Sequence, residues 1–402
     1  MKGFESMKLS QRILGMKPSA TLAVDAKAKE LKSQGKNVIS FGSGEPDFVS
    51  PPSAFKYAAE AMEKGKTHYT STPGVPELRQ EICAYYQKEF GLKFDPGQVV
   101  VGPGAKPCIY EALAAIVDPG DEIVLLAPAW VSYIEQIHLV DGKPVIVETE
   151  DSGFIPRLDR VEAAITDRTI ALLLNSPSNP TGVLFNEKTV RGLAEIAQKH
   201  DLWLIWDEIY EKLVYGQNKH INPLQLMPEL ASRTIIINGV SKAYAMTGWR
   251  IGYSIAPLEL SSKINSFQSH LTSNACSIAQ WAAVGAMRES REDVLRMKAA
   301  FSDRRDLICG LLRKMPHISF PEPEGAFYVF VNIKNCIGMS FEGQKIKDDI
   351  GFCNMLLDSE LVAVVPGSAF LASGYLRISY ASSPEQITEG MKRLHCFLAK
   401  LK

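Results

Sequence analysis

The chain has 402 residues, more than a single hydrophobic core usually holds and enough for two domains. Its 44 basic and 45 acidic residues nearly balance, so we expect neither a nucleic-acid nor a membrane partner; no apolar stretch approaches a membrane span. Seven scattered cysteines without a C-x-x-C pair, and histidines without metal-ligand spacing, predict no disulfide framework and no metal. We therefore expect a globular protein of a reducing compartment, the cytoplasm.

The first hundred residues predict helices and one short strand. Helical patterns cover about 22–31, 53–64 and 75–89, and residues 38–41, most of which favour β-strands, predict a short strand. A glycine- and proline-containing turn at 42–48 follows the strand. A polar loop at 67–74 separates the second and third helices.

From residue 97 the pattern becomes strand, loop, helix, repeated. The apolar runs are 98–101, 122–126, 144–147, 170–174, 202–206, 234–237 and 251–255, with helical stretches between most of them. Seven runs joined by crossovers predict an α/β fold with a mostly parallel seven-stranded sheet covered on both faces. Ligands bind such sheets beyond the carboxyl ends of the strands, so we expect the site there.

The last part of the chain predicts a smaller α+β unit. A long helix at 293–314 leads to strands at 326–331, 362–365 and 375–380 and to a final helix at 384–401. We expect the N-terminal residues to join this unit. The predicted division is a large domain over 48–295 and a small domain built from 1–47 and 296–402.

Residues 238–253 place one lysine, Lys242, in a loop of small residues between two apolar runs, with Arg250 eight positions later. Burial in such a loop would lower the pKa of the lysine and make its amine a nucleophile. The segment S-K-A-Y-A-M-T-G-W-R-I-G-Y resembles the Schiff-base lysine motif of fold-type I pyridoxal phosphate enzymes, the aspartate aminotransferase family. The resemblance implies that Lys242 holds pyridoxal 5'-phosphate and that Arg250 binds its phosphate.

A glycine-rich turn supplies a second candidate for the phosphate site. Gly104, Ala105 and Lys106 lie where a predicted strand ends and a helix begins, and helix N-termini favour anions. The family often has a hydroxyl residue three positions before the lysine. Here that position is Gly239, and Ser241 is a candidate to replace it.

Three further motifs match the family in the same order along the chain. In D-E-I-Y the resemblance assigns Asp207 to the pyridinium nitrogen and Tyr210 to the ring oxygen. A carboxylate that ends a strand is otherwise often a helix N-cap. In N-S-P-S-N-P-T-G it assigns Asn179 to the ring oxygen, and Trp130 corresponds to the aromatic residue that stacks on the ring. Both Trp130 and Asn179 are also expected to contact substrate.

The resemblance also implies substrate and subunit contacts. It places Arg377, in a C-terminal strand, and Gly44 at the α-carboxylate of an amino acid or 2-oxo acid. It makes Tyr69 the residue that reaches the phosphate of a neighbouring chain. The implied assembly is a homodimer with shared active sites.

The implied reaction is transamination by a ping-pong mechanism, in which Lys242 also shuttles the substrate proton. Lys106, with Ser19 and Thr21, resembles the bacterial aspartate branch, where this lysine recognises the distal carboxylate. We therefore expect transfer from aspartate to 2-oxoglutarate. Prephenate, aromatic and alanine aminotransferases, and lyases on the same fold, stay open as alternatives.

A different class on the same fold is a pyridoxal-phosphate-binding transcriptional regulator. Such proteins carry a DNA-binding domain before the first aminotransferase motif. The first motif here is at Gly44, too early for such a domain, and the near-neutral charge agrees. We therefore expect an enzyme.

Overall fold

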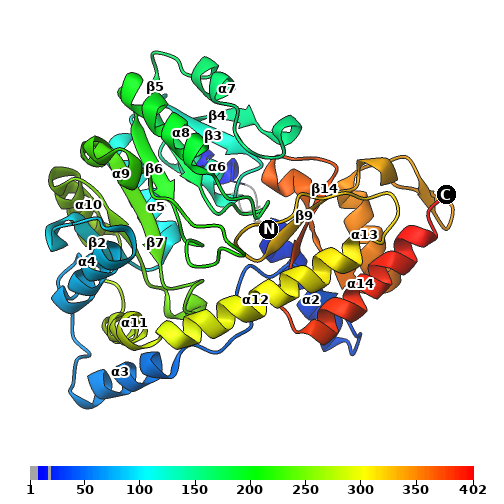
Figure 1. Cartoon of the computed structure of the whole chain (residues 1–402), viewed down its shortest axis with the longest axis horizontal. Helices are drawn as coiled ribbons and strands as arrows, with labels where there is room; N and C mark the ends of the chain where they lie inside the picture. The colour runs from blue at the N-terminus through cyan, green and yellow to red at the C-terminus, as the bar shows by residue number, and fades with distance from the viewer. Residues whose placement is uncertain (1–7, 17–19) are drawn as a thin grey trace, which may run out of the picture.

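The computed structural model describes residues 8–16 and 20–402. Figure 1 shows a large sheet with its helices on one side of the molecule and a smaller unit on the other, with the long helix α12 running along both. Within the described residues, no helix is both long and apolar enough to cross a bilayer. The two units are held together by contacts between segments far apart in the sequence.

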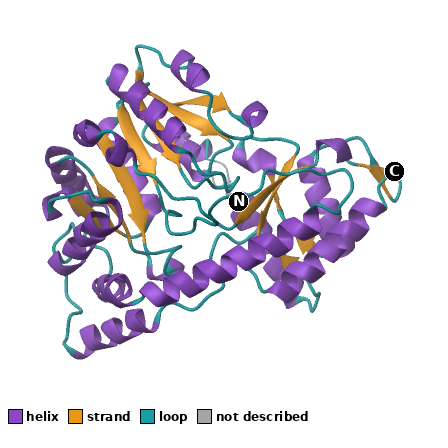
Figure 2. Ribbon diagram, viewed as in Figure 1, coloured by secondary structure: helices purple, strands orange, loops and turns teal. Residues whose placement is uncertain are grey.

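The large sheet has seven strands in the order β2-β8-β7-β6-β5-β3-β4. Figure 2 draws its strands as orange arrows with purple helices around them. Strand β8 runs antiparallel to both neighbours, and the pairs from β7 to β4 are parallel. This confirms the predicted mostly parallel sheet, and each of the seven apolar runs forms one strand. The strands are β2 (Val99–Gly102), β3 (Glu122–Ala127), β4 (Lys143–Glu148), β5 (Thr169–Asn175), β6 (Trp203–Asp207), β7 (Thr234–Gly239) and β8 (Gly252–Ile255).

Both faces of this sheet are buried because successive side chains of a strand point to opposite sides. Ile123 and Leu125 pack in one hydrophobic cluster with α5, while Val124 and Leu126 pack in another with α8. The near-continuous apolar strands therefore need helices on both sides. The helices of the large unit are α3 (Pro52–Glu63), α4 (Pro76–Phe90), α5 (Ala105–Ile116), α6 (Ser132–Leu139), α7 (Leu158–Ala163), α8 (Glu187–Lys199), α9 (Pro223–Leu226), α10 (Leu258–Leu271) and α11 (Ser277–Glu289).

The smaller unit contains an antiparallel sheet in the order β13-β14-β9 and a parallel pair of β1 with β12. The predicted strand at 362–365 is wrong as one element, because Val364 separates two short strands that belong to different sheets. The short helix α1 (Gln11–Leu14) lies beside α6 of the large unit, where Gly15 and Met16 line a cavity with His138. The elements of the smaller unit are α2 (Ala20–Ser33), β1 (Ile39–Ser40), α12 (Arg291–Leu312), β9 (Tyr328–Asn332), β10 (Ser340–Phe341), β11 (Gln344–Lys345), α13 (Asp349–Glu360), β12 (Val362–Ala363), β13 (Val365–Pro366), β14 (Tyr375–Ser379) and α14 (Pro384–Ala399).

One hydrophobic core joins the two ends of the chain. Ile39 and Phe41 pack in the same cluster as the buried residues of α12, β14 and α14. We propose on this ground the division into a large domain, 48–295, and a small domain, 1–47 with 296–402. The same cluster also takes in Ile209 and Tyr210, which follow β6, so the domains share part of a core.

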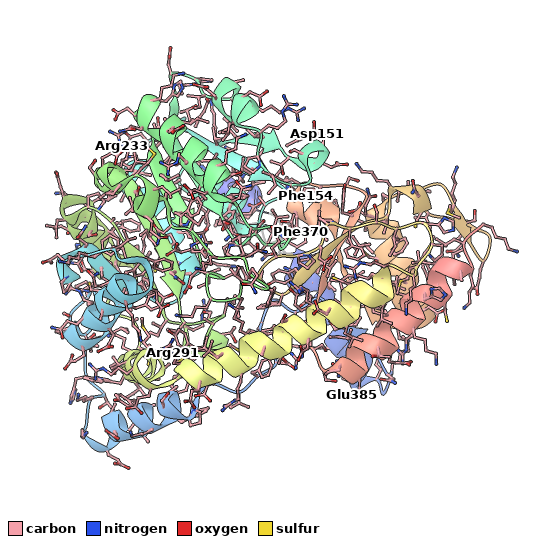
Figure 3. All side chains as sticks on the ribbon, in the orientation of Figure 1. Asp151, Phe154, Arg233, Arg291, Phe370 and Glu385 are labelled. Carbon is pink, nitrogen blue, oxygen red and sulfur yellow. The ribbon has the colours of Figure 1, made fainter. Side chains whose placement is uncertain are left out.

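Aromatic residues pack against one another where the large sheet meets the smaller unit. Phe154 packs edge-on against Phe330, with ring centroids 5.6 Å apart, and against Tyr375 at 5.5 Å. Figure 3 labels Phe154 and Phe370 close together where the two units meet. Phe330 also contacts Phe370, at 6.3 Å, so the strands β9 and β14 are covered by residues of both units.

A glycine at the end of the 175–182 motif makes a second contact between the units. The carbonyl of Gly182 accepts hydrogen bonds from the backbone N–H groups of Glu324 and Gly325, both at 2.9 Å. Its φ is +71°, and a Cβ at this position would lie 2.5 Å from Pro323 Cβ and 2.9 Å from the carbonyl oxygen of Tyr328. Only glycine fits both the conformation and the space.

Replacing this glycine tests how much the close contact matters. Gly216 has a similar φ of +65°, but a Cβ added there would have no neighbour within 4 Å, so it is the matched control. Gly216→Ala should lower the free energy of unfolding by about 1–2 kcal/mol, because alanine disfavours the left-handed backbone conformation. Gly182→Ala should lower the free energy of unfolding by roughly 1–3 kcal/mol more than Gly216→Ala does, because the loop must also move away from Pro323. Urea unfolding of both variants measures the difference, and equal losses would contradict a steric role for Gly182.

Candidate active site

A cavity of about 600 Å³ lies beyond the carboxyl ends of β5, β6 and β7. Its walls also include residues of α2, α5, β9 and β14, so both units contribute. This is the edge of the sheet at which we expected the site. Most of the predicted site residues line this cavity, namely Gly44, Ala105, Lys106, Trp130, Asn179, Asp207, Tyr210, Lys242, Arg250 and Arg377.

Lys242 reaches into the cavity from the loop after β7. Its Nζ donates a hydrogen bond to the carbonyl of Gly44 at 2.5 Å and lies 5.9 Å from the centre of the Tyr210 ring. Burial of the amine, and then the positive charge of Arg377, lowers the pKa of Lys242 to about 8, although Glu45 opposes this effect. At pH 7 roughly a tenth of such an amine is therefore neutral and nucleophilic, against less than about a thousandth of a solvated lysine.

Asp207, the last residue of β6, is 3% exposed. Its carboxylate accepts hydrogen bonds from the Tyr133 hydroxyl, at 2.6 Å, and from the backbone N–H of Ile209, at 3.1 Å. Burial raises the pKa of Asp207 to about 6, and the two hydrogen bonds oppose that rise. No helix directly follows Asp207, so the N-cap interpretation of this residue is wrong.

The N-terminus of α5 and Arg250 form a cradle for an anion. Gly104 precedes the helix with φ +107° and no side-chain cap, and a Cβ there would lie 2.3 Å from Nη2 of Arg250. Lys106, in the first turn, places its Nζ 4.9 Å from the centre of the Trp130 ring. Burial and the nearby Arg250 lower the pKa of Lys106. Two cations at the positive end of a helix favour an anion between them.

Gly239, where the sequence departs from the family pattern, has little room for a side chain. A Cβ at Gly239 would lie 2.8 Å from the carbonyl oxygen of Ile251 and 2.9 Å from Cα of Gly252, on the neighbouring strand β8. A hydroxyl residue therefore does not fit there without moving β8. Ser241 lines the cavity two residues later, so it stays a candidate for the replacement donor.

Arg377 is a buried cation on the opposite wall. It is 2% exposed, and its guanidinium donates to Asn179 Oδ1, at 3.2 Å, and to the carbonyl of Gly42, at 2.6 Å. Its Cζ lies 4.5 Å and 5.0 Å from the ring centres of Tyr328 and Phe370. In the described part of the chain, no carboxylate forms an ion pair with it. Because a buried unpaired charge is costly, this geometry indicates an anionic ligand.

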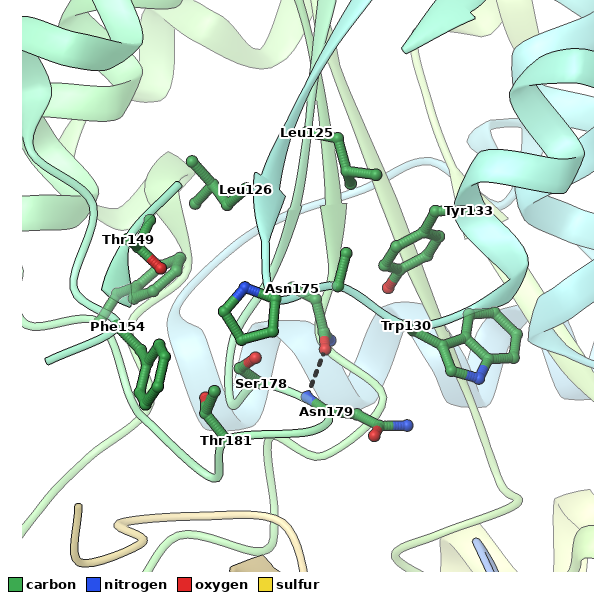
Figure 4. A pocket seen from close by; sticks show the side chains of 13 residues that line it. Leu125, Leu126, Trp130, Tyr133, Thr149, Phe154, Asn175, Ser178, Asn179 and Thr181 are labelled. Atoms are coloured by element: carbon green, nitrogen blue, oxygen red, sulfur yellow. Dashed lines mark hydrogen bonds between the residues drawn. The ribbon is translucent and has the colours of Figure 1, made fainter. Parts of the chain in front are cut away.

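The remaining cavity wall is made by polar and aromatic residues that support one another. Asn175 Oδ1 accepts a hydrogen bond of 2.9 Å from the backbone N–H of Asn179. Figure 4 shows this bond, with Trp130 and Tyr133 to one side of it. The rings of Trp130 and Tyr133 meet edge to face, 5.3 Å apart. Tyr210 shares a hydrogen bond of 3.0 Å with the hydroxyl of Tyr328, and burial raises the pKa of Tyr210.

Two predicted residues, Gly104 and Tyr69, stand apart from the cavity lining, and two others lie partly or wholly outside the described residues. Gly104 shapes the cradle without lining the cavity. Tyr69 is 92% exposed on the loop between α3 and α4, away from the cavity. Thr21 lies in α2, but its side chain is outside the described residues, as is the whole of Ser19.

Sequence reasoning missed several cavity residues. Tyr133 is three positions after Trp130 at the start of α6, and this helical spacing was the available signal. Tyr328 lies on β9 and contributes its hydroxyl from a part of the chain with no recognised motif. Glu45 and Lys29 also line the cavity. These residues become neighbours only through the packing of the two units.

The residues present fit pyridoxal phosphate. The cradle of Gly104 and Arg250 suits a phosphate, since the missing Cβ leaves room for the guanidinium at a helix N-terminus. A buried carboxylate, Asp207, and a lysine of lowered pKa, Lys242, face the same cavity. For metals the finding differs: across residues 8–16 and 20–402, no group of three acidic, cysteine or histidine side chains could hold an ion.

Comparison with known sequences gives the same result over nearly the whole chain. The family model for aminotransferase class I and II matches residues 36–394. The aspartate/prephenate aminotransferase of Cereibacter sphaeroides is 44% identical over 98% of this chain and 99% of its own length. The aspartate aminotransferase of Geobacillus stearothermophilus is 42% identical over 98% of this chain and 99% of its own.

Solved structures agree. The aspartate aminotransferase of Rhizobium meliloti superposes with a TM-score of 0.95 at 40% identity, over 98% of this chain and 100% of that one. The Thermus thermophilus aspartate aminotransferase with maleate gives 0.92 at 40% identity, over 97% and 100%. The chain therefore has the fold-type I architecture and belongs to the aminotransferase class I and II family of pyridoxal-phosphate-dependent enzymes.

Proposed function

We propose that this aminotransferase moves the amino group of L-aspartate to 2-oxoglutarate. The observation that carries the proposal is the pair of cations, Arg377 and Lys106, that line one cavity without an acidic partner among the residues described. A substrate with two carboxylates would pair with both. The relatives named as aspartate aminotransferases support this choice, as does the Thermus structure with maleate, itself a dicarboxylate.

The geometry suggests how the cofactor would be held. The start of α5 and Arg250 would bind the phosphate, Trp130 would stack on the ring, and Asp207 would face the ring nitrogen. Tyr210 and Asn179 would contact the ring oxygen. When bound, pyridoxal phosphate supplies an electron sink for the bond that is broken at the substrate Cα. A positive ring nitrogen beside Asp207 would keep that carboxylate ionised in spite of its burial.

The protein residues then have distinct tasks. Arg377 would bind the α-carboxylate and so orient the substrate Cα toward Lys242. Lys242, which would also bind the cofactor covalently through Nζ, takes the Cα proton as its free amine and returns it on the cofactor side. Its pKa of about 8 suits both parts of this exchange. Gly44, whose carbonyl accepts from Lys242, lines the same cavity and would contact the α-carboxylate.

Prephenate is a second candidate substrate. The Cereibacter relative, at 44% identity, is named an aspartate/prephenate aminotransferase. Prephenate also carries two carboxylates, so the same two cations would bind it. Activity of the purified enzyme with prephenate and an amino donor, compared with that for 2-oxoglutarate, tests this candidate.

We also propose that the protein is cytoplasmic. All seven cysteines are free, and four of them, Cys108, Cys309, Cys336 and Cys353, are buried thiols. Buried free thiols suit a reducing compartment. Fractionation of cells that express the chain tests this proposal, and recovery in an extracellular fraction would contradict it.

The lowered pKa of Lys242 predicts a pH dependence for cofactor uptake. Because only the neutral amine reacts, the rate at which cofactor-free protein combines with pyridoxal phosphate should rise with pH, with a midpoint near pH 8. A solvated lysine would give a midpoint near about 10.4. Arg377→Gln removes a charge that lowers this pKa, so the midpoint should move upward. Stopped-flow absorbance measures the rates, and Lys242→Ala should not react.

Borohydride reduction followed by peptide mapping identifies the reacting lysine directly. A label on any lysine other than Lys242 would overturn its assignment. Asp207→Asn is the companion variant. Lys242 should still be labelled in it, but kcat should fall to a small fraction of the native value, since the ring nitrogen would no longer face a carboxylate. Near-native turnover in Asp207→Asn would remove Asp207 from this role.

The role of Lys106 predicts a loss that depends on the substrate. Lys106→Ser should lower kcat/KM for aspartate by about ten- to a hundredfold, the worth of a charged hydrogen bond, while alanine and phenylalanine change little. Arg377→Lys is the control, because loss of the planar fork should weaken every substrate together. Steady-state kinetics with the three amino donors decide the matter. An equal loss for all three in Lys106→Ser would place Lys106 at the phosphate.

The exposed Tyr69 predicts a homodimer with shared sites. A tyrosine that is 92% exposed in one chain would be covered if its hydroxyl reached the phosphate of a second chain. Sedimentation should therefore give twice the mass of one chain. Tyr69→Phe should keep that mass and weaken pyridoxal phosphate binding by about three- to tenfold. Tyr57→Phe, whose hydroxyl bonds Glu289 of the same chain, should bind normally; a monomer, or equal binding by both variants, would refute the shared site.

A further inference from the structure

The loop at 241–250, here called the lysine loop, carries Lys242 near one end and Arg250 at the other. Its backbone is irregular: Ala245 and Arg250 have φ values of 49° and 56°, in the left-handed region that non-glycine residues rarely adopt. Its internal backbone hydrogen bonds are few and long, between 3.2 and 3.3 Å, as in Met246 N–H to the Ser241 carbonyl. Contacts from outside the loop are therefore needed to fix it.

A single hydroxyl, that of Ser50, supplies two of these contacts. Ser50 Oγ donates to the carbonyl of Ala245 at 2.9 Å and accepts from the indole Nε1–H of Trp249 at 3.0 Å. One of its partners is the residue with the positive φ, and the other is next to Arg250. The hydroxyl thus bridges the two halves of the loop across the turn between them.

Residues 44–50, here called the clamp segment, make further contacts with the same loop. Thr247 Oγ1 donates to Glu45 Oε2 at 2.8 Å, and the Gly44 carbonyl accepts from Lys242. The segment is itself anchored: Asp47 receives two hydrogen bonds from Arg304 of α12, at 2.6 and 3.0 Å. The clamp segment therefore links the lysine loop to a rigid helix.

We propose that Ser50 is a positioning residue that holds the lysine loop, and with it Lys242 and Arg250, in the geometry that binds the cofactor. The proposal rests on the roles assigned above to Lys242 and Arg250. Ser50 itself does not line the cavity. It acts through the loop, because its hydrogen bonds to the Ala245 carbonyl and the Trp249 indole hold the segment between Lys242 and Arg250.

The chain offers a closely matched control. Ser53, three residues later in α3, is 8% exposed, and its hydroxyl has no hydrogen-bond partner among the described atoms. Ser50→Ala and Ser53→Ala therefore remove the same group from nearby positions, but only the first removes two contacts with the loop. Trp249→Phe keeps an aromatic ring and removes one of those two contacts.

Two measurements on the cofactor-free protein test the proposal. Hydrogen exchange of the loop amides between residues 243 and 249 should be faster in Ser50→Ala than in the native chain, less so in Trp249→Phe, and unchanged in Ser53→Ala. Titration with pyridoxal phosphate should give a Kd raised about tenfold by Ser50→Ala, the worth of one to two hydrogen bonds, and an intermediate value for Trp249→Phe.

Native exchange and native affinity in Ser50→Ala would overturn the proposal, as would equal effects of Ser50→Ala and Ser53→Ala. Ser50→Thr keeps a hydroxyl at this position and should retain most of the affinity for pyridoxal phosphate. The exchange measurement also separates this inference from the proposed function. A borohydride label on a lysine other than Lys242 would refute the assigned chemistry, whereas loop exchange in cofactor-free protein would still report whether Ser50 holds the loop.

Discussion

Burial of charge at one edge of the seven-stranded sheet is the constraint on which the rest of the structure depends. Arg377 and Asp207 are almost completely buried and lie around one cavity with Lys242. Each such charge is costly without partners, so each is held by neutral dipoles: Arg377 by Asn179 and a backbone carbonyl, Asp207 by Tyr133 and a backbone N–H. Neutral partners fix position and leave the charge free for a ligand.

The same constraint explains the pKa values of the two titrating groups. Burial moves the pKa of Lys242 down to about 8 and that of Asp207 up to about 6, so the two values approach each other from opposite sides. A lysine that gives and takes a proton needs a pKa near the working pH. The electrostatics of the cavity therefore prepare the chemistry before any substrate enters it.

Segments from both ends of the chain reach the cavity, so ligand binding depends on how the two units are placed. The segment after β1 starts in the smaller unit, where β1 pairs with β12. At its other end it touches the lysine loop through Gly44, Glu45 and Ser50. Arg377 arrives from the opposite end of the chain, on β14. A displacement of either unit would thus change the site, because its two walls come from different parts of the sequence.

The seven strands, their mostly parallel sheet and the motifs around Lys242, Asp207 and Asn179 could be predicted from the amino-acid sequence, because hydrophobic periodicity and short motifs are local properties. Other features became visible only in the folded chain. Packing within the smaller unit divides 362–365 between two sheets, and packing within the large unit brings Tyr133 to Asp207 and β8 against Gly239. Contacts between distant segments leave no local pattern, since they depend on how whole helices and strands pack against one another.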